Sequence, residues 1–277
     1  MKDVSFGQYY PVSSFLHRMD ARIKILFLIA YIVAIFVASN FYGLAVCAGV
    51  LLLGIIFSRV PLHKILRSLS GVLFIVLFTA ALNVLFYSGD QVYWEGPAVY
   101  WEWGIFRVSQ AGIVFAIFLV LRLVLLVTCS SLLTYTTTPV DLTDGIESLL
   151  TPLKWIKFPV HELALIMSIA LRFIPILMDE TERIKNAQKA RGADFEHGGL
   201  VKKIKAIIPI LIPLLLSAFR RADELGDAMD ARCYTGSKNR TKYKKHRLGW
   251  RDLIGFFVLA CMVTGVVLLR VYLSAPL

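Results

Sequence analysis

Two stretches of the sequence, 41 residues apart, place an arginine beside small residues in the same order. They are Ala187-x-x-Ala190-Arg191-Gly192 and Ala228-x-x-Ala231-Arg232-Cys233. An arginine presents five N–H donors in a fixed fork, which suits carboxylate and carbonyl oxygens. Small residues three apart form a narrow helix face that fits into a groove. The pattern predicts two helix ends that dock into grooves of another protein.

A structural explanation of each arginine alone stays open. A cation near the C-terminus of a helix is favoured by the helix dipole. Gly192 is also an ordinary residue for the position just after a helix. We favour docking because both copies close an amphipathic helical pattern and both set small residues beside a single arginine.

Residues that could support catalysis show no productive spacing. No phosphate-binding G-x-x-x-x-G-K-[ST] run occurs, so the chain is not expected to hydrolyse ATP. His161 and Glu162 open a helical pattern, but Leu165 stands where a zinc-protease motif needs its second histidine. Ser130 and Ser131 have no base at a fixed spacing. The five histidines are scattered, and we predict no metal site and no cofactor.

The composition indicates an integral membrane protein. Of the 277 residues, 57% are hydrophobic and 18% are charged, and the mean hydropathy is +0.69. Soluble domains average about 45–50% apolar and about 25% charged residues. The net charge of +11 does not indicate nucleic-acid binding, because the cations lie between and after long apolar runs. The four cysteines show no C-x-x-C spacing, so neither a zinc site nor a disulfide framework follows.

Five apolar runs are long enough to cross a membrane, and we therefore predict an all-α, polytopic membrane protein. Four lie in an N-terminal region, 1–137, and the fifth in a C-terminal region, 251–277. The predicted N-terminal spans are about 23–38, 41–57, 70–87 and 105–134. The first two form a hairpin that turns at Ser39-Asn40, because one straight helix from Ile25 to Phe57 would reach roughly 50 Å.

The links between the spans set the orientation. Arg59, Lys64 and Arg67 lie in one link without an acid, whereas Asp90, Glu95 and Glu102 lie in the next. Positive charge favours the cytoplasmic side, so the N-terminus is expected inside and the C-terminus outside. The outer link also carries Tyr93, Trp94, Tyr100, Trp101 and Trp103, which we interpret as an interfacial aromatic belt rather than a ligand cage.

Arg122 lies in the middle of the fourth span, where a charge is costly and usually faces the interior of the bundle. No acid within the spans pairs with it. Backbone carbonyls, a water-filled face or a partner subunit could satisfy its donors.

Region 138–250 is predicted to be a cytoplasmic domain of long amphipathic helices. Residues 141–252 hold 34 of the chain's 49 Asp, Glu, Lys and Arg residues. The predicted helices are about 139–152, 160–191 and 200–234. Thr138 and Asp141 have the spacing of a capping box for the first. The other two each begin apolar and end charged, and we expect them to lie along the membrane face, kinked at Pro175, Pro209 and Pro213.

These features together resemble one family. The paired Ala-Arg-Gly and Ala-Arg-Cys ends, the proline-containing helices before them, and the opening Gly7-Gln8-Tyr9-x-Pro11 through His17-Arg18-x-Asp20-x-Arg22-x-Lys24 are similar to the transmembrane T component of energy-coupling factor (ECF) transporters. The likeness covers essentially the whole chain.

The resemblance implies a subunit of an uptake complex for a vitamin or a metal in a bacterial cell membrane. Its partners would be two ABC-type ATPases, a substrate-binding membrane S component and the lipid bilayer, with no nucleic acid. It implies ATPase docking by Ala190, Arg191 and Gly192, and by Ala231, Arg232 and Cys233. The S component is expected to contact the apolar parts of the same helices, with Leu163, Leu165, Met167, Ile210, Leu214 and Leu215 as candidates.

One position departs from the family pattern. Cys233 replaces glycine and lacks its freedom at positive φ, which puts an identical ending of the second helix in doubt. Two other functions stay open from the residues alone: an intramembrane enzyme using Ser130, Ser131, His161 and Glu162, and a stand-alone secondary transporter. The transported substrate, and whether the scaffold is shared among S components, do not follow from the sequence.

Overall fold

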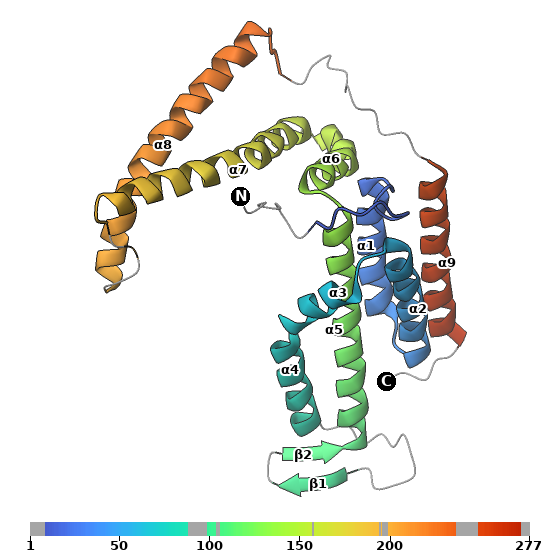
Figure 1. Cartoon of the computed structure of the whole chain (residues 1–277). Coiled ribbons are helices and arrows are strands. Elements are labelled where there is room, and N and C mark those ends of the chain that lie inside the picture. The colour runs from blue at the N-terminus through green and yellow to red at the C-terminus, as the bar shows by residue number, and fades with distance from the viewer. Residues whose placement is uncertain are drawn as a thin grey trace. The chain divides into compact units, whose positions relative to one another are not determined.

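A computed structural model describes residues 9–87, 99–103, 106–156, 158–193, 195, 199–236 and 249–272. The chain divides into two compact units: the larger contains Gly7–Ile146 and His246–Leu277, and the smaller contains Glu147–Lys245. In the larger unit the elements are α1 (Ala21–Val37), α2 (Phe41–Ser58), α3 (Leu62–Ser70), α4 (Leu73–Phe86), β1 (Val99–Trp103), β2 (Phe106–Ser109), α5 (Gln110–Thr136) and α9 (Trp250–Tyr272) (Figure 1). Helix α6 (Pro139–Leu150) joins the units, and the smaller one continues with a 3₁₀ turn (Thr151–Ile156), α7 (Val160–Ala190) and α8 (Leu200–Ala231).

The described residues confirm the all-α, polytopic membrane fold. Helices α2, α5, α7 and α9 are long and apolar enough to cross a membrane, and α3 with α4 makes a fifth candidate if this bent pair is one span. Helix α1 has 17 residues and forms the predicted hairpin with α2. Length and composition would thus let α7 cross a membrane as well, so its placement along the membrane face stays a prediction.

The third span, predicted over 70–87, corresponds to α4, which begins three residues later and ends one residue earlier. An unpredicted helix, α3, lies in the basic link before it, and the two helices meet at a bend of 58° at Gly71-Val72. The hydroxyls of Ser68 and Ser70 donate to the carbonyls of Ile65 and Arg67, so they compete for the carbonyl oxygens that a continuous helix would use. Glycine at the break adds a poor helix former.

The fourth span begins later than the predicted residue 105. Residues 106–109 form strand β2, which pairs antiparallel with β1, and α5 starts at Gln110. The side chain of Ser109 accepts a hydrogen bond from the backbone N–H of Gly112, which fixes the start of the helix. Tyr100 and Trp101 of the predicted aromatic belt lie on β1, whereas Tyr93 and Trp94 lie outside the described residues.

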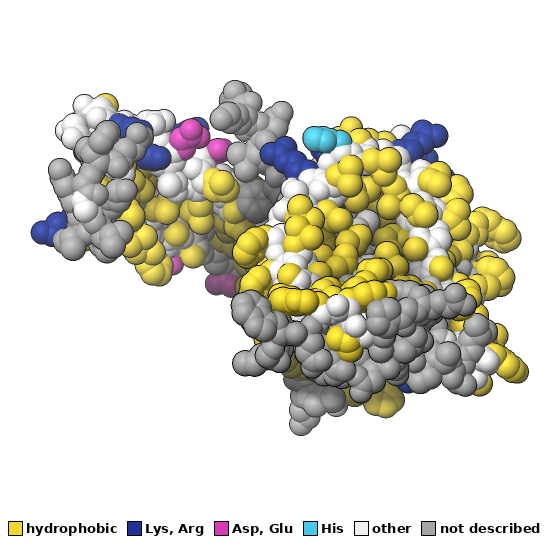
Figure 2. Space-filling view, turned by 90° about the horizontal axis from the view of Figure 1, so that it is seen from below, with side chains coloured by type: hydrophobic (Ala, Val, Ile, Leu, Met, Phe, Trp, Pro, Cys, Tyr) yellow, Lys and Arg dark blue, Asp and Glu magenta, His cyan; other side chains and the backbone are white. Residues whose placement is uncertain are grey.

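The bundle packs around α1, α2, α5 and α9. Its fully buried side chains include Tyr31, Ile35, Leu44 and Cys47, with Met262 and Val266 from α9. The turn between α1 and α2 is tight: a Cβ on Gly43 would lie 3.0 Å from the Cβ of Ala38, closer than most Cβ contacts, so a larger residue there would require Ala38 to shift. In the view from below, hydrophobic side chains cover much of the described part of the bundle that Figure 2 shows.

The smaller unit has little interior of its own. Among its described side chains, Val160 is buried on α7 and none is buried on α8. The start of α6 matches the sequence expectation: Pro139 is its first residue, and the Thr138 hydroxyl accepts from the backbone N–H of Asp141. Helices α7 and α8 end one and three residues before their predicted ends, 191 and 234.

Candidate functional site

Helices α7 and α8 pack against each other along faces that follow the 41-residue repeat. Half-buried residues recur on each helix at spacings of three and four, as expected of a packing stripe. On α7 they include Ile169, Phe173, Leu177, Glu180, Ile184 and Gln188, and on α8 the residues 41 positions later, Ile210, Leu214, Ala218, Arg221, Leu225 and Met229. The repeat seen at the helix ends thus extends along the packed faces.

One ion pair joins equivalent positions of the repeat. Arg221 Nη2 donates to Glu180 Oε2 at 3.3 Å, and both side chains are about one third exposed. Arg191 follows Glu180 by eleven residues, and Arg232 follows Arg221 by the same number. At 1.5 Å per residue, each motif arginine therefore lies about 16 Å along its helix from this contact.

The two helices end with the same backbone geometry. After α7, the N–H of Gly192 donates to the carbonyl of Lys189, and that of Ala193 to Gln188. After α8, Cys233 donates to Asp230, and Tyr234 to Met229. These are the paired bonds of a Schellman motif.

Cys233 takes the left-handed conformation without being glycine. Its φ is +55°, against +89° for Gly192. The doubt about the second ending is therefore resolved, because both helices close alike. Cys233 adopts a left-handed backbone conformation that glycine would adopt without strain.

All six residues of the two predicted docking motifs are exposed. Arg191 and Arg232 are the C-cap residues of α7 and α8. Figure 1 shows these two helix ends well apart, as expected for two long helices that cross. The arrangement provides two separate, cationic, equivalent ends, which suits two docking events rather than one shared site.

The predicted S-component residues fall into two sets. Leu163, Met167 and Leu215 are exposed, whereas Leu165, Ile210 and Leu214 are half-buried. Ile210 and Leu214 belong to the stripe between α7 and α8. Pro175, Pro209 and Pro213 all lie inside helices that continue through them.

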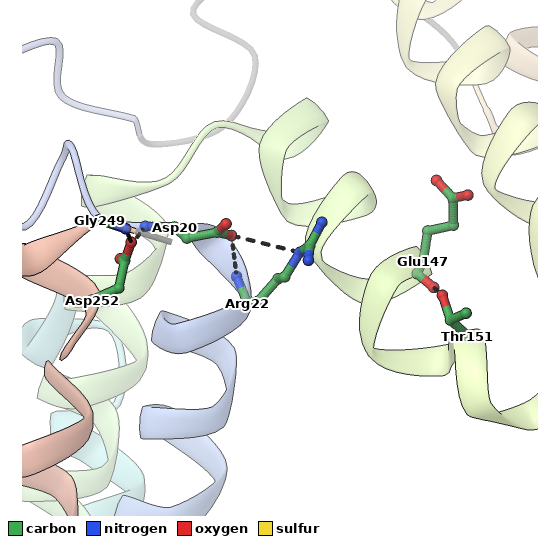
Figure 3. A network of polar contacts seen from close by, with 6 residues as sticks. All are labelled: Asp20, Arg22, Glu147, Thr151, Gly249 and Asp252. Atoms are coloured by element: carbon green, nitrogen blue, oxygen red, sulfur yellow. Dashed lines mark hydrogen bonds and ion pairs between the residues drawn. The ribbon is translucent and has the colours of Figure 1, made fainter. Parts of the chain in front are cut away.

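A second polar cluster, which includes residues of the opening motif that the sequence analysis quoted without a structural role, lies at one end of the bundle. Asp252, at the start of α9, is buried and accepts from the backbone N–H groups of Asp20 and Gly249 at 2.9 and 2.8 Å (Figure 3). Asp20 in turn caps α1 through the N–H of Arg22. Lys24 Nζ donates to the carbonyl of Thr136, at the end of α5, at 2.9 Å. The sequence signal that could have indicated this cluster is the charged residue at the edge of an apolar run, Lys24 before the first and Asp252 before the last.

His17 belongs to the same end of the bundle. Its Nε2 lies 2.9 Å from the carbonyl oxygen of Tyr10, and its Nδ1 lies 2.7 Å from the hydroxyl of Ser14. Burial lowers the pKa of His17, and the nearby charge of Lys24 acts in the same direction, against the raising effect of the carbonyls of Tyr10 and Tyr135. The neutral ring fits these contacts, with Nε2–H as donor and Nδ1 as acceptor.

Arg122 finds a backbone carbonyl, one of the three possibilities that the sequence left open. Its Nη2 donates to the carbonyl of Ala38 at 2.9 Å, in the turn between α1 and α2. The guanidinium also lies over the rings of Phe118 and Phe36, at 4.7 and 5.6 Å from their centroids. Arg122 therefore ties the hairpin to α5.

The four residues of the enzyme alternative lie on two helices, Ser130 and Ser131 on α5 and His161 and Glu162 on α7. His161 Nδ1 lies 3.1 Å from Glu147 Oε1, and Ser130 is exposed on α5. Within the described part of the chain, no three His, Cys, Asp or Glu residues gather as a metal site would require.

Comparison with known proteins identifies the family. The family model described as "Cobalt transport protein" (CbiQ) matches residues 12–243. A protein of Brevibacillus brevis named "Energy-coupling factor transporter transmembrane protein EcfT" is 49% identical over 252 residues, which cover 91% of this chain and 92% of that protein. Proteins of the same name from Ruminiclostridium cellulolyticum and Bacillus subtilis are 44% and 43% identical, over 98% and 95% of this chain and 98% of each relative. The relatives are named as a transporter component rather than as an enzyme, and the chain belongs to this family of transmembrane components of ECF transporters.

Proposed function

We propose that the chain is the scaffold and coupling subunit of an ECF importer that takes up a micronutrient, such as a vitamin. Two ABC-type ATPase subunits, which hydrolyse the ATP, dock at the ends of α7 and α8. A substrate-binding S component lies against the apolar parts of the same two helices. The observation that carries the proposal is the pair of exposed arginines on identical helix ends, at equal distances from the contact between Glu180 and Arg221.

The symmetry of the helix pair supports two ATPases of the same fold. Two equivalent docking points, related through one central contact, suit two partners that are themselves related by a two-fold axis. A movement of one ATPase against the other would then change the angle between α7 and α8, because each helix is held at its end. Each arginine would act as a planar, always charged anchor in its groove.

The proposed surface for the S component is the apolar side of the pair. Leu163, Met167 and Leu215 are exposed there, and the described side chains of the smaller unit form no interior that could bury them. Leucine and methionine form an adaptable surface that can accept more than one partner. The half-buried Leu165, Ile210 and Leu214 would support this surface from below.

The proposal places the protein in a bacterial cell membrane with its N-terminus and region 138–250 in the cytoplasm. In a variant without the four native cysteines, a cysteine at Thr235 should be labelled only after the membrane is opened. A cysteine at Tyr100 should be labelled from outside in intact cells. The opposite pattern would reverse the orientation.

The coupling role is tested by reversing the two arginine charges. The double variant Arg191→Glu, Arg232→Glu should insert into the membrane but lose the ATPase subunits on purification, and uptake should stop. Breaking a buried charge pair at an interface costs about 2–5 kcal/mol. The matched control is Arg183→Glu, Arg220→Glu, which reverses two exposed arginines of the same helices. Full uptake with stoichiometric ATPases in the first variant would refute the coupling role.

A further inference from the structure

The bundle contains an apolar cavity that the coupling proposal does not use. It has a volume of about 330 Å³ and lies between α1, α2, α5 and α9. Along α2 it extends from Val50 to Phe57, and along α9 from Ile254 to Val258. Seven residues of helix correspond to about 10 Å, so the cavity is elongated along the helices. Such a volume is within the range of small-molecule pockets, about 300–1,000 Å³.

The cavity has a closed wall and an open side. On the closed wall, Leu51, Cys129 and Leu132 are each less than a tenth exposed. On the other side, Leu53 and Phe57 of α2 and Ile254 of α9 are 53%, 57% and 39% exposed. The cavity therefore opens sideways between α2 and α9, on a surface that faces the lipid tails.

The lining offers almost nothing to a polar ligand. Among the described lining residues, the polar groups of the wall are those of Lys24 and Thr136. The Nζ of Lys24 is already bonded to the carbonyl of Thr136 and the hydroxyl of Thr137, so its aliphatic stem faces the cavity. A cavity with an apolar lining of this kind suits a hydrocarbon chain.

The mouth of the cavity carries a cation at the level of the membrane interface. Phe15 and Phe57, whose rings are 6.2 Å apart, both line it, and the guanidinium of Arg251 lies over Phe15 at 5.9 Å from the ring centroid. Trp250 is 77% exposed at the first residue of α9, where an aromatic side chain marks the interface.

The carboxylates nearby are occupied by protein donors. Asp252 accepts from two backbone N–H groups, and Asp20 contacts Arg22. The guanidinium of Arg251 is therefore the charge that an anionic headgroup would meet beside the mouth.

We infer that this cavity is a binding site for an anionic phospholipid. One acyl chain enters between α2 and α9 and lies along the closed wall, and the phosphate lies beside Arg251. The acyl chain fills the apolar volume that the protein side chains leave empty. The headgroup gives the site its preference for a negatively charged lipid.

The test uses the full chain in liposomes with phosphatidylglycerol that carries a diazirine in the middle of one acyl chain. After irradiation and digestion, we expect label in peptides of α2 residues 50–57 and α9 residues 254–258. Unlabelled phosphatidylglycerol should compete for this label better than phosphatidylcholine of the same chains. Equal competition by the two lipids would overturn the anionic site.

Two pairs of variants locate the lipid. Val258→Trp fills the cavity and should abolish the cavity label, whereas its control Phe256→Trp, on an exposed position of α9, should keep it. Arg251→Gln should weaken phosphatidylglycerol binding about fivefold, while Arg270→Gln, at the other end of α9, should not. Unchanged labelling of Val258→Trp would place the chain on the outer surface and refute the site. If Val258→Trp does not insert, Val50→Trp replaces it, and the competition measurement on the unmodified chain still decides.

Discussion

The helical bundle and the α7–α8 pair differ in where their apolar side chains are covered. The bundle encloses Tyr31, Ile35 and Leu44 completely, and it fixes its helix ends with buried polar contacts such as those of Asp252. The pair buries Val160 on α7 and, among the described side chains of α8, none. Its exposed face carries Leu, Ile, Met and Phe residues over most of its first half.

The two parts therefore depend on different contacts. The bundle buries apolar side chains and polar contacts within itself, so its stability depends on its own residues. The pair buries little surface within itself, so lipid or partner proteins must cover it, and its shape is free to follow theirs. Changes in the bundle should therefore lower stability, and changes on the pair should alter assembly.

The largest expected effect on stability is that of Asp252→Ala. It removes the acceptor of two backbone N–H groups, those of Asp20 and Gly249, and should destabilise the bundle by about 2 kcal/mol or more. The measurement is the apparent Tm of the purified chain in detergent. Asp227→Ala, on the exposed surface of α8, is the matched control and should leave the Tm unchanged. Equal shifts in the two variants would remove the contrast between the bundle and the pair.

A smaller and more selective effect is expected from an aspartate on the apolar face of the pair. Leu215→Asp places a charge on an exposed position and should weaken binding of the S component about tenfold or more, while the ATPases stay bound. Leu214→Asp, one residue earlier on the half-buried stripe, should instead disturb the packing of α8 on α7 and reduce both partners. Co-purification with each subunit measures the two outcomes. Loss of the ATPases alone from Leu215→Asp would show that the two ends of the helices were assigned the wrong way round.

The elements with strong periodic or compositional signals could be predicted from the sequence. The hairpin at Ser39-Asn40 follows from a charge-free run too long for one span, and the start of α6 follows from Thr138 and Pro139. Helix α3 was not predicted, because its charged residues, such as Lys64 and Arg67, indicate a link between spans rather than a helix. The strand that precedes α5, Phe106–Ser109, was missed because these residues adjoin the apolar run of α5 and were counted as part of it.

Contacts between distant residues stayed hidden in the sequence. That Arg122 meets the carbonyl of Ala38, and Lys24 that of Thr136, depends on how the helices pack. Matching half-buried positions show that the repeat continues along the packed faces of α7 and α8. The residue types did not reveal this, because equivalent positions hold different residues, such as Phe173 and Leu214 or Glu180 and Arg221.

The ends of the pair allow a matched test of backbone strain. Gly192 has φ +89°, and no atom of the described residues lies within 4 Å of the place that a Cβ would take, so Gly192→Ala should cost about 1 kcal/mol through conformation alone. Cys233→Gly should relieve a similar strain at φ +55°. The measurement is hydrogen exchange of the two amides that close the motifs. The Ala193 amide should exchange about fivefold faster in Gly192→Ala, and the Tyr234 amide about fivefold slower in Cys233→Gly. No change at Tyr234 would mean that the cysteine is not strained.

The smallest expected effect is a pH dependence at His17, at the polar end of the bundle. Because burial and the charge of Lys24 lower its pKa in the folded protein, the unfolded chain binds a proton more readily than the folded one. Stability should therefore be constant above pH 7, fall as the pH drops below the unfolded value of 6.5, and level off once the folded ring is also protonated. The apparent Tm measured between pH 7.5 and pH 5 checks this. His17→Gln, which cannot titrate, should remove this part of the pH dependence, and an unchanged profile in that variant would assign it to another group.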